Sequence, residues 1–126
     1  MMLIELKPYG TKPLYEQLML EIKRGIATCQ LTPGSPLPSV RSLASDIGIN
    51  MHTVNKVYKA LQAEGVLLKV KSGFVVNPNP LTPTQLTEEK LSNLIYEIAL
   101  EMKLYNWSNE HVMSKLDEIK FEREDN

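Results

Sequence analysis

The chain has 126 residues, which fits one domain, or one small domain with an appendage. Hydrophobic residues make up 43% and aromatic residues 6%, so we expect a modest core of mainly aliphatic side chains. The single cysteine, Cys29, excludes an intrachain disulfide, and two distant histidines form no metal-ligand cluster. No apolar run approaches the roughly 20 residues that span a bilayer, and no signal-peptide pattern is present. We therefore expect a cytoplasmic protein without membrane contact.

The net charge of −1 hides an asymmetry along the chain. Residues 1–80 carry nine Lys/Arg and five Asp/Glu, a net charge of +4. Residues 81–126 carry five Lys/Arg and ten Asp/Glu, a net charge of −5. The basic part could meet phosphates, whereas the acidic part should avoid them.

A first amphipathic helix is predicted over residues 14–27. Apolar residues recur at every fourth position from Leu14 to Ile26, with charged residues on the opposite face. Pro13 suits the first turn of such a helix. Three prolines between residues 31 and 38 then interrupt regular structure, so a loop follows.

Two short helices are predicted next, over residues 39–47 and 51–64. A helix-turn-helix unit needs a small residue where its helices cross, a glycine in the turn and a β-branched residue on the buried face of the second helix. Ala44, Gly48 and Val54 supply these residues. Four further expected core positions are also apolar: Leu43, Ile47, Ile49 and Val57. The pattern favours a helix-turn-helix unit over the alternative, an ordinary helical hairpin.

A β-hairpin is predicted directly after the second helix. Apolar and β-branched runs at residues 66–70 and 74–76 flank the turn Lys71-Ser72-Gly73. A helix-turn-helix unit followed by a hairpin is the winged arrangement. The expected fold is therefore mainly α with a small β-hairpin, and residues 1–77 form a winged helix-turn-helix domain.

The rest of the chain predicts a linker at residues 78–83 and a two-helix dimerisation arm at residues 84–126. The apolar stripes of this arm exceed what two short helices hide against each other, and exposed patches of that size usually mark a partner. We expect a homodimer; the alternative is an arm folded back onto its own winged domain. The expected dimerisation residues are Leu91, Leu94, Ile95, Ile98, Met102, Trp107, Val112, Leu116 and Ile119.

The second helix of the helix-turn-helix unit has an outward face that suits a DNA major groove. Its buried positions follow the spacing i, i+3, i+4, i+7 from Val54, which turns polar and basic residues outward. The expected DNA-contacting residues are Ser39, Arg41, Ser42, His52, Thr53, Asn55, Lys56, Lys59, Lys71, Ser72 and Gly73. For Arg41 the alternative is a solvent salt bridge to Asp46, and for the lysines a merely solvated face.

Three segments resemble the GntR family of bacterial regulators. PLYEQL at residues 13–18 resembles its opening motif, LTPGSPLPSVRSLA at residues 31–44 its long signature, and NMHTVNKVY at residues 50–58 its recognition helix. The short two-helix tail is similar to that of the YtrA subfamily, whose members dimerise through it.

The resemblance implies a homodimer bound to a palindromic double-stranded DNA operator, usually as a repressor, with Arg41, Thr53 and Asn55 at DNA-contacting positions. Two features depart from the family. Met51 occupies a position where many relatives carry arginine or proline. The wing turn has one glycine and one residue fewer than the family's usual Gly-x-Gly-Thr-Phe/Tyr-Val.

Other functions are less well supported by the sequence. A small-molecule effector is the family's usual second ligand, and here it would have to lie at a dimer interface or in a domain crevice. Neither a phosphate-binding glycine loop nor a nucleophile–base pair is present, so we expect no enzyme activity and no cofactor. The alternative class is a winged-helix protein-interaction module without DNA binding, against which Lys56, Lys59, Lys69 and Lys71 argue.

Overall fold

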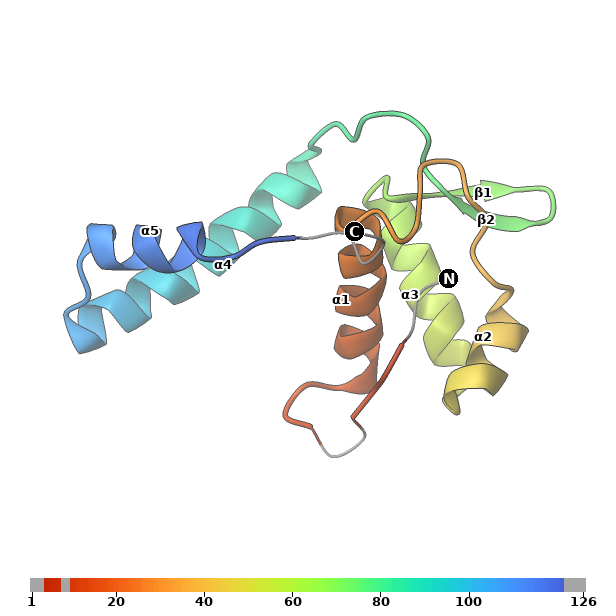
Figure 1. Ribbon diagram of the computed structural model, residues 1–126, viewed down its shortest axis with the longest axis horizontal. Helices are drawn as coiled ribbons and strands as arrows, with labels where there is room; N and C mark the ends of the chain where they lie inside the picture. The colour runs from red at the N-terminus through yellow and green to blue at the C-terminus, as the bar shows by residue number, and fades with distance from the viewer. Residues whose placement is uncertain (1–3, 8–9, 122–126) are drawn as a thin grey trace. The chain divides into compact units, whose positions relative to one another are not determined.

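The computed structural model describes residues 4–7 and 10–121. Within these residues it contains five helices and one two-stranded sheet (Figure 1). In chain order the elements are α1 (Leu14–Ala27), α2 (Val40–Ile47), α3 (Met51–Ala63), β1 (Leu67–Val70), β2 (Gly73–Val76), α4 (Gln85–Tyr105) and α5 (Asn109–Asp117). They divide into two compact units at Thr82 and Pro83, with α1 to β2 in the first unit and α4 and α5 in the second. None of the helices in the described residues has the length and apolar character needed to cross a bilayer.

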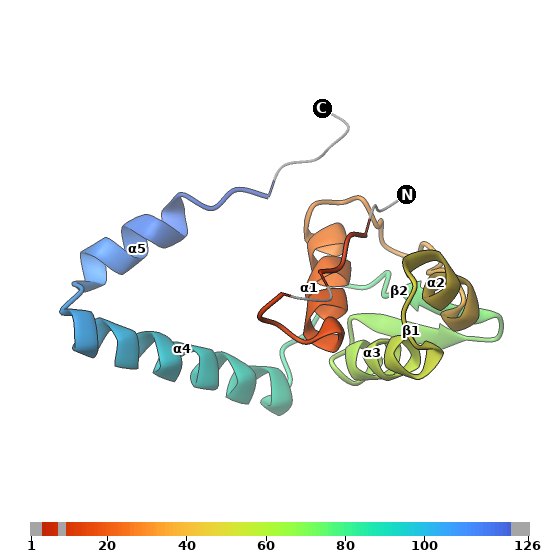
Figure 2. The ribbon, with the colours of Figure 1, turned by 90° about the horizontal axis from the view of Figure 1, so that it is seen from below.

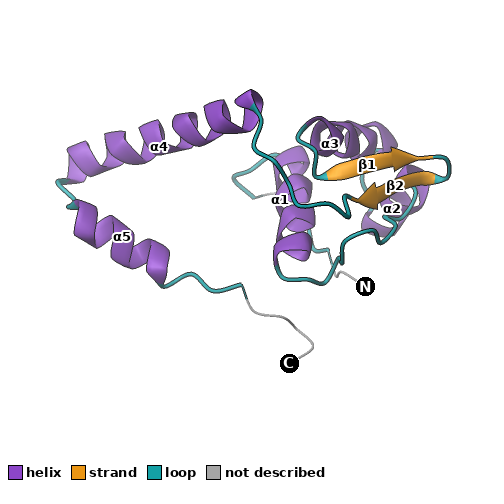
Figure 3. Ribbon diagram, turned by 90° about the horizontal axis from the view of Figure 1, so that it is seen from above, coloured by secondary structure: helices purple, strands orange, loops and turns teal. Residues whose placement is uncertain are grey.

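The core of the first unit is built around α3. Four residues of α3 at helical spacing are fully buried: Val54, Val57, Tyr58 and Leu61. Leu18 and Ile22 of α1 and Leu67 of β1 are fully buried as well. Because α3 packs against α1, α2 and β1, its opposite side is left facing outward (Figure 3). The inward face predicted from the residue spacing is confirmed.

The turn between α2 and α3 has the geometry that its sequence predicts. Gly48 ends α2 in the left-handed conformation, with φ of 71°, where a Cβ atom would be strained. Its N–H donates to the carbonyl oxygen of Ala44 at 2.9 Å. Asn50 caps α3, since its Oδ1 accepts a hydrogen bond from the backbone N–H of His52 at 2.7 Å. Capping at both sides of the turn fixes where α3 begins.

The wing is an antiparallel hairpin with a short tip. Val70 pairs with Gly73, so only Lys71 and Ser72 lie in the turn. Gly73 was predicted to lie in the turn, and this boundary is wrong by one residue. The φ of 143° at Gly73, in a region that favours glycine, lets the chain enter the β2 pairing directly after a two-residue turn.

The loop between α1 and α2 adds a third chain to this hairpin. Pro36 forms an isolated antiparallel bridge with Val75, and the N–H of Leu37 donates to the carbonyl oxygen of Phe74 at 2.9 Å. The Phe74 ring packs edge-on against Tyr58 of α3, with 5.2 Å between the ring centroids. The loop, the wing and α3 are thereby joined in one packed unit.

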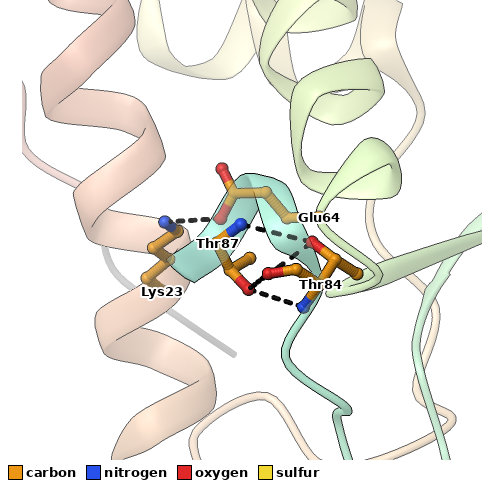
Figure 4. Close-up of polar contacts among 4 residues, drawn as sticks. All are labelled: Lys23, Glu64, Thr84 and Thr87. Carbon is orange, nitrogen blue, oxygen red and sulfur yellow. Dashed lines mark hydrogen bonds and ion pairs between the residues drawn. The ribbon is translucent and has the colours of Figure 1, made fainter. Parts of the chain in front are cut away.

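In the second unit, both helices begin with side-chain caps. The Thr84 hydroxyl accepts from the N–H of Thr87 at 3.2 Å, and the Thr87 hydroxyl accepts from the N–H of Thr84 at 2.7 Å (Figure 4). Helix α4 ends at Asn106, which adopts a left-handed φ of 55°. Ser108 caps α5, since its hydroxyl accepts from the N–H of His111 at 3.0 Å. From this turn the two helices diverge (Figure 2).

Candidate nucleic-acid interface

The outward face of α3 is polar and basic. His52, Lys56 and Lys59 are exposed, and Thr53 and Asn55 are half-buried beside them. Helix α3 contains no Asp or Glu residue. The face therefore presents hydrogen-bond donors, acceptors and positive charge, which are the groups that contact base edges and phosphates.

Met51 also lies at the N-terminal end of this face. It is the first residue of α3, and 40% of it is exposed. From the sequence, Met51 was noted only as a departure from the arginine or proline of many relatives. Its exposure shows an apolar group at the end of the helix that approaches base edges in helix-turn-helix proteins. Such a group can contact the C5-methyl of thymine.

The two lysines of α3 differ in their surroundings. The Nζ atom of Lys56 lies 5.3 Å from the centroid of the Tyr15 ring on α1, within the range of a cation–π interaction. Lys59 is exposed and forms no ion pair in the described part of the chain. Lys56 is thus anchored to α1, whereas Lys59 is free to reach outward. This contact of Tyr15 was not predicted from the sequence, although the residue lies within the opening motif.

The N-terminal turn of α2 carries three more of the predicted residues. Arg41 and Ser42 are exposed, and the Ser39 hydroxyl accepts a hydrogen bond from the N–H of Ser42 at 3.0 Å. Ser39 is therefore the N-cap of α2. No ion pair joins Arg41 to Asp46 among residues 4–7 and 10–121, so the alternative predicted for Arg41 is not observed. Its guanidinium stays available at the positive end of the helix dipole.

The wing places Lys71 and Ser72 at its exposed tip. Gly73, the third residue predicted there, is half-buried in β2. Lys69 on β1 is exposed, and its Nζ atom lies 5.0 Å from the centroid of the Phe74 ring. The tip therefore offers one positive charge and one hydroxyl.

A partly buried ion pair with Lys23 compensates the negative charge of Glu64, directly after α3. Glu64, the C-cap of α3, has a side chain that is only 13% exposed, and its Oε1 atom lies 2.9 Å from the Nζ atom of Lys23 on α1 (Figure 4). This pair ties α1 to the end of α3. This pair was not predicted from the sequence, because the two residues are far apart in the chain.

A buried tyrosine holds α3 against the loop before α2. The Tyr58 hydroxyl donates a hydrogen bond to the carbonyl oxygen of Pro38 at 2.8 Å. Burial raises the pKa of Tyr58 well above its ordinary value, because the charged phenolate loses its hydration. The hydroxyl thus remains a donor, and it fixes the position of α3 relative to the chain that enters α2.

The second unit exposes most of its apolar side chains. Seven of the nine residues predicted for dimerisation are exposed, while Met102 and Val112 are half-buried. Ile119 lies beyond the end of α5 rather than within a helix. Further apolar residues outside the predicted dimerisation set are also exposed: Leu86, Tyr96, Leu100, Leu104, Tyr105, Met113 and Phe121. Because apolar residues surround α4, a stable fold requires burial on more than one side.

The first unit is a winged helix-turn-helix, and α3, the second helix of the helix-turn-helix pair, has a polar and basic outward face. These features define a DNA-binding domain. The sequence model of the bacterial regulatory proteins of the gntR family matches residues 14–76. The chain is 33% identical to the transcriptional repressor YtrA of Bacillus subtilis over 86% of this chain and 91% of that protein. The chain therefore belongs to the GntR family of DNA-binding transcription regulators.

Solved structures agree with this assignment. YtrA from Sulfolobus acidocaldarius, a GntR-family transcription factor, is 35% identical, with a TM-score of 0.62 over 77% of this chain and 97% of that chain. The DNA-binding domain of AraR in complex with operator ORX1 is 28% identical, with a TM-score of 0.50 over 56% of this chain and 86% of that chain. The predicted winged fold and family resemblance are confirmed, and a DNA-binding regulator is favoured over an interaction module.

Proposed function

We propose that the protein is a homodimeric repressor that binds a palindromic DNA operator, with α3 of each protomer in the major groove. The observation that carries this proposal is the outward face of α3, which combines exposed His52, Lys56 and Lys59 with the absence of any carboxylate in the helix. Phosphate attraction and base recognition both need such a face.

The proposed contacts fall into two groups. Arg41, His52 and Asn55 contact base edges, because guanidinium and amide groups form bidentate hydrogen bonds with guanine and adenine. Met51 adds an apolar contact at the same end of α3. The remaining predicted residues position the protein on the DNA backbone: Ser39, Ser42, Thr53, Lys56, Lys59, Lys71, Ser72 and Gly73.

Dimerisation follows from the apolar surface of the second unit. Most of the large apolar side chains of α4 and α5 are exposed in the single chain, and this surface would be unfavourable in water. A two-fold dimer through α4 and α5 buries it and supplies two copies of α3 for a palindromic site. The proposed domain boundaries are accordingly residues 1–77, 78–83 and 84–126.

Repression and location follow from the relatives and from the ligand. The Bacillus subtilis relative is named a repressor. A dimer bound over a promoter excludes RNA polymerase, which is the simplest way for a short regulator to act. Because the proposed ligand is operator DNA, we place the protein in the cytoplasm.

The test is selection of a preferred site from randomised duplexes with the full-length protein. We expect an enriched site with two-fold symmetry, bound at least a thousandfold more tightly than a scrambled duplex at physiological salt. The Asn55→Ala variant should retain its fold and lose most of this preference. Ser92→Ala on α4 is the control and should bind as the wild type does. Equal binding to selected and scrambled duplexes would refute the proposal.

A further inference from the structure

A cavity of about 530 Å³ lies within the first unit, beside the loop that joins α1 to α2. Its walls are mostly apolar and include Ile22, Leu31, Leu37 and Ile47. This volume falls within the range of roughly 300–1,000 Å³ that is typical of small-molecule sites. The cavity belongs to the DNA-binding unit itself and requires no separate effector domain.

The polar groups of the wall restrict what the cavity can hold. The Oε1 atom of Gln30 is buried and has no hydrogen-bond partner in the described part of the chain. The Ser35 hydroxyl already donates to the carbonyl oxygen of Thr32 at 2.6 Å. Asp46 is the one charged residue among the described wall residues. A ligand that carries a donor could satisfy Gln30 after a small side-chain rotation, whereas the carboxylate of Asp46 would repel an anion.

The wall of the cavity is directly bonded to the elements that face DNA. In the loop, the N–H of Gly34 donates to the carbonyl oxygen of Val76 at 2.8 Å, and the N–H of Leu37 donates to the carbonyl oxygen of Phe74 in β2 at 2.9 Å. The carbonyl of Pro38, also in the wall, accepts the hydrogen bond from Tyr58 of α3. A ligand that moves this loop therefore moves the wing and the start of α2 relative to α3.

We propose that this cavity binds an uncharged, mainly apolar small molecule with an N–H or O–H donor, and that its binding changes the affinity for DNA. The proposed binding of the small molecule depends only on the cavity, whereas its effect on DNA affinity rests on the proposed function. Coupling is reciprocal, so DNA must change the affinity for the small molecule by the same factor.

Indole is the probe, because it is uncharged, apolar and carries one N–H donor. Two analogues are compared with it: 1-methylindole, which lacks the donor, and indole-3-acetate, which adds a carboxylate. Each is titrated into the ¹⁵N-labelled full-length protein and followed by two-dimensional NMR. We expect indole to shift the resonances of Gln30, Leu37 and Ile47. Indole should bind about two- to tenfold more tightly than 1-methylindole, which is the usual contribution of one hydrogen bond. The difference in affinity between indole and indole-3-acetate should be larger still.

Two variants test the site, and one serves as a matched control. Gln30→Met keeps the side-chain length without the acceptor, so indole and 1-methylindole should bind it equally. Ile47→Trp fills the cavity from its half-buried wall and should abolish indole binding. Gln85→Met makes the same substitution on exposed α4 and should preserve the difference between the probes. If Ile47→Trp does not fold, Gln30→Met still decides the role of the acceptor.

The final measurement is the Kd for the selected duplex with and without saturating indole. We expect a change of at least threefold for the wild type and none for Ile47→Trp. No indole-dependent shifts, or shifts confined to α4 and α5, would overturn the cavity site. Binding of indole without a change in the DNA Kd would overturn the coupling. Absence of sequence-specific DNA binding would overturn the proposed function, while the NMR result would stand independently.

Discussion

Replacing Arg41 should have different effects on DNA binding, depending on whether its side chain contacts a base or a phosphate. If its guanidinium bonds guanine, Arg41→Ala should cost about 1–3 kcal/mol per half-site and relax preference at one base position. Arg41→Lys keeps the charge but loses the bidentate geometry, so it should restore affinity more than selectivity. Site selection with all three proteins measures both quantities. A uniform loss of affinity on every sequence would make Arg41 a phosphate contact.

The proposed contact of Met51 can be tested by changing a single methyl group in the DNA. If its thioether contacts a thymine C5-methyl, replacing that thymine by deoxyuridine should cost about 0.8 kcal/mol, or about fourfold in Kd. The Met51→Ala variant should bind both duplexes equally, since the contact is already lost. Competition binding with the two duplexes measures the effect. Equal sensitivity of wild type and variant to deoxyuridine at every thymine would exclude this contact.

Tyr58 predicts a loss of stability in alkali. Its folded-state pKa is raised above the ordinary value of about 10, so at high pH the unfolded chain releases the phenolic proton before the folded chain does. The contribution is therefore fully present below about pH 10 and decreases as the pH rises further. Tyr58→Phe lacks this contribution and also loses the bond to Pro38, at about 0.5–1.5 kcal/mol.

Urea unfolding of wild type and Tyr58→Phe between pH 8 and pH 11 provides the measurement. The difference in unfolding free energy should shrink above about pH 10, while other titrating groups cancel in the comparison. A constant difference across this range would show that the phenol does not resist ionisation in the folded protein.

At the level of whole elements, local patterns predicted helices better than they predicted contacts between helices. Residues 14–27 form α1 as expected, because the apolar spacing and Pro13 are local signals. The wing turn differed by one residue, since the pairing of Gly73 depends on its backbone conformation. The contact of Lys56 with Tyr15 was not predictable from spacing, because it joins helices distant in sequence.

The site shows the same difference between local patterns and contacts that depend on the packing of distant elements. Exposure of His52, Lys56 and Lys59 follows from the helical period of buried residues within α3. The ion pair of Glu64 with Lys23 requires the three-dimensional packing of α1 on α3. The cavity beside α2 has no sequence signal, because the space between packed elements is set by the fold.

The lysines of α3 should differ in what their removal does to DNA binding. Lys59→Ala should flatten the slope of log K against log salt by about one unit per phosphate contact, hence about two units in a dimer. Lys56→Ala should do the same and also lower stability slightly, since it removes the cation–π contact with Tyr15. Lys115→Ala on exposed α5 is the matched control. Binding titrations at several salt concentrations decide this, and an unchanged slope for Lys59→Ala would exclude a phosphate contact.

At the scale of the whole molecule, we expect the apolar surface of the second unit to control assembly and, through it, DNA binding. Ile98 lies near the middle of α4 and is exposed in the single chain. Placing a charge there by Ile98→Asp would bury an unpaired carboxylate in a dimer interface, at a cost of several kcal/mol. We expect the wild type to be a dimer at micromolar concentration and Ile98→Asp to be a folded monomer, as measured by light scattering. Asn93→Asp, also exposed on α4, is the control and should remain dimeric.

Loss of the dimer should weaken binding to the full palindrome far more than binding to an isolated half-site. The reason is that two linked half-sites bind with a high effective concentration, and this advantage disappears when the protomers separate. Removal of residues 81–126 should have the same effect as Ile98→Asp, because the first unit contains its own core. Anisotropy titrations on both duplexes provide the comparison. A wild-type monomer in solution, or a monomeric variant with unchanged affinity for the palindrome, would show that α4 and α5 do not act by pairing two copies of α3.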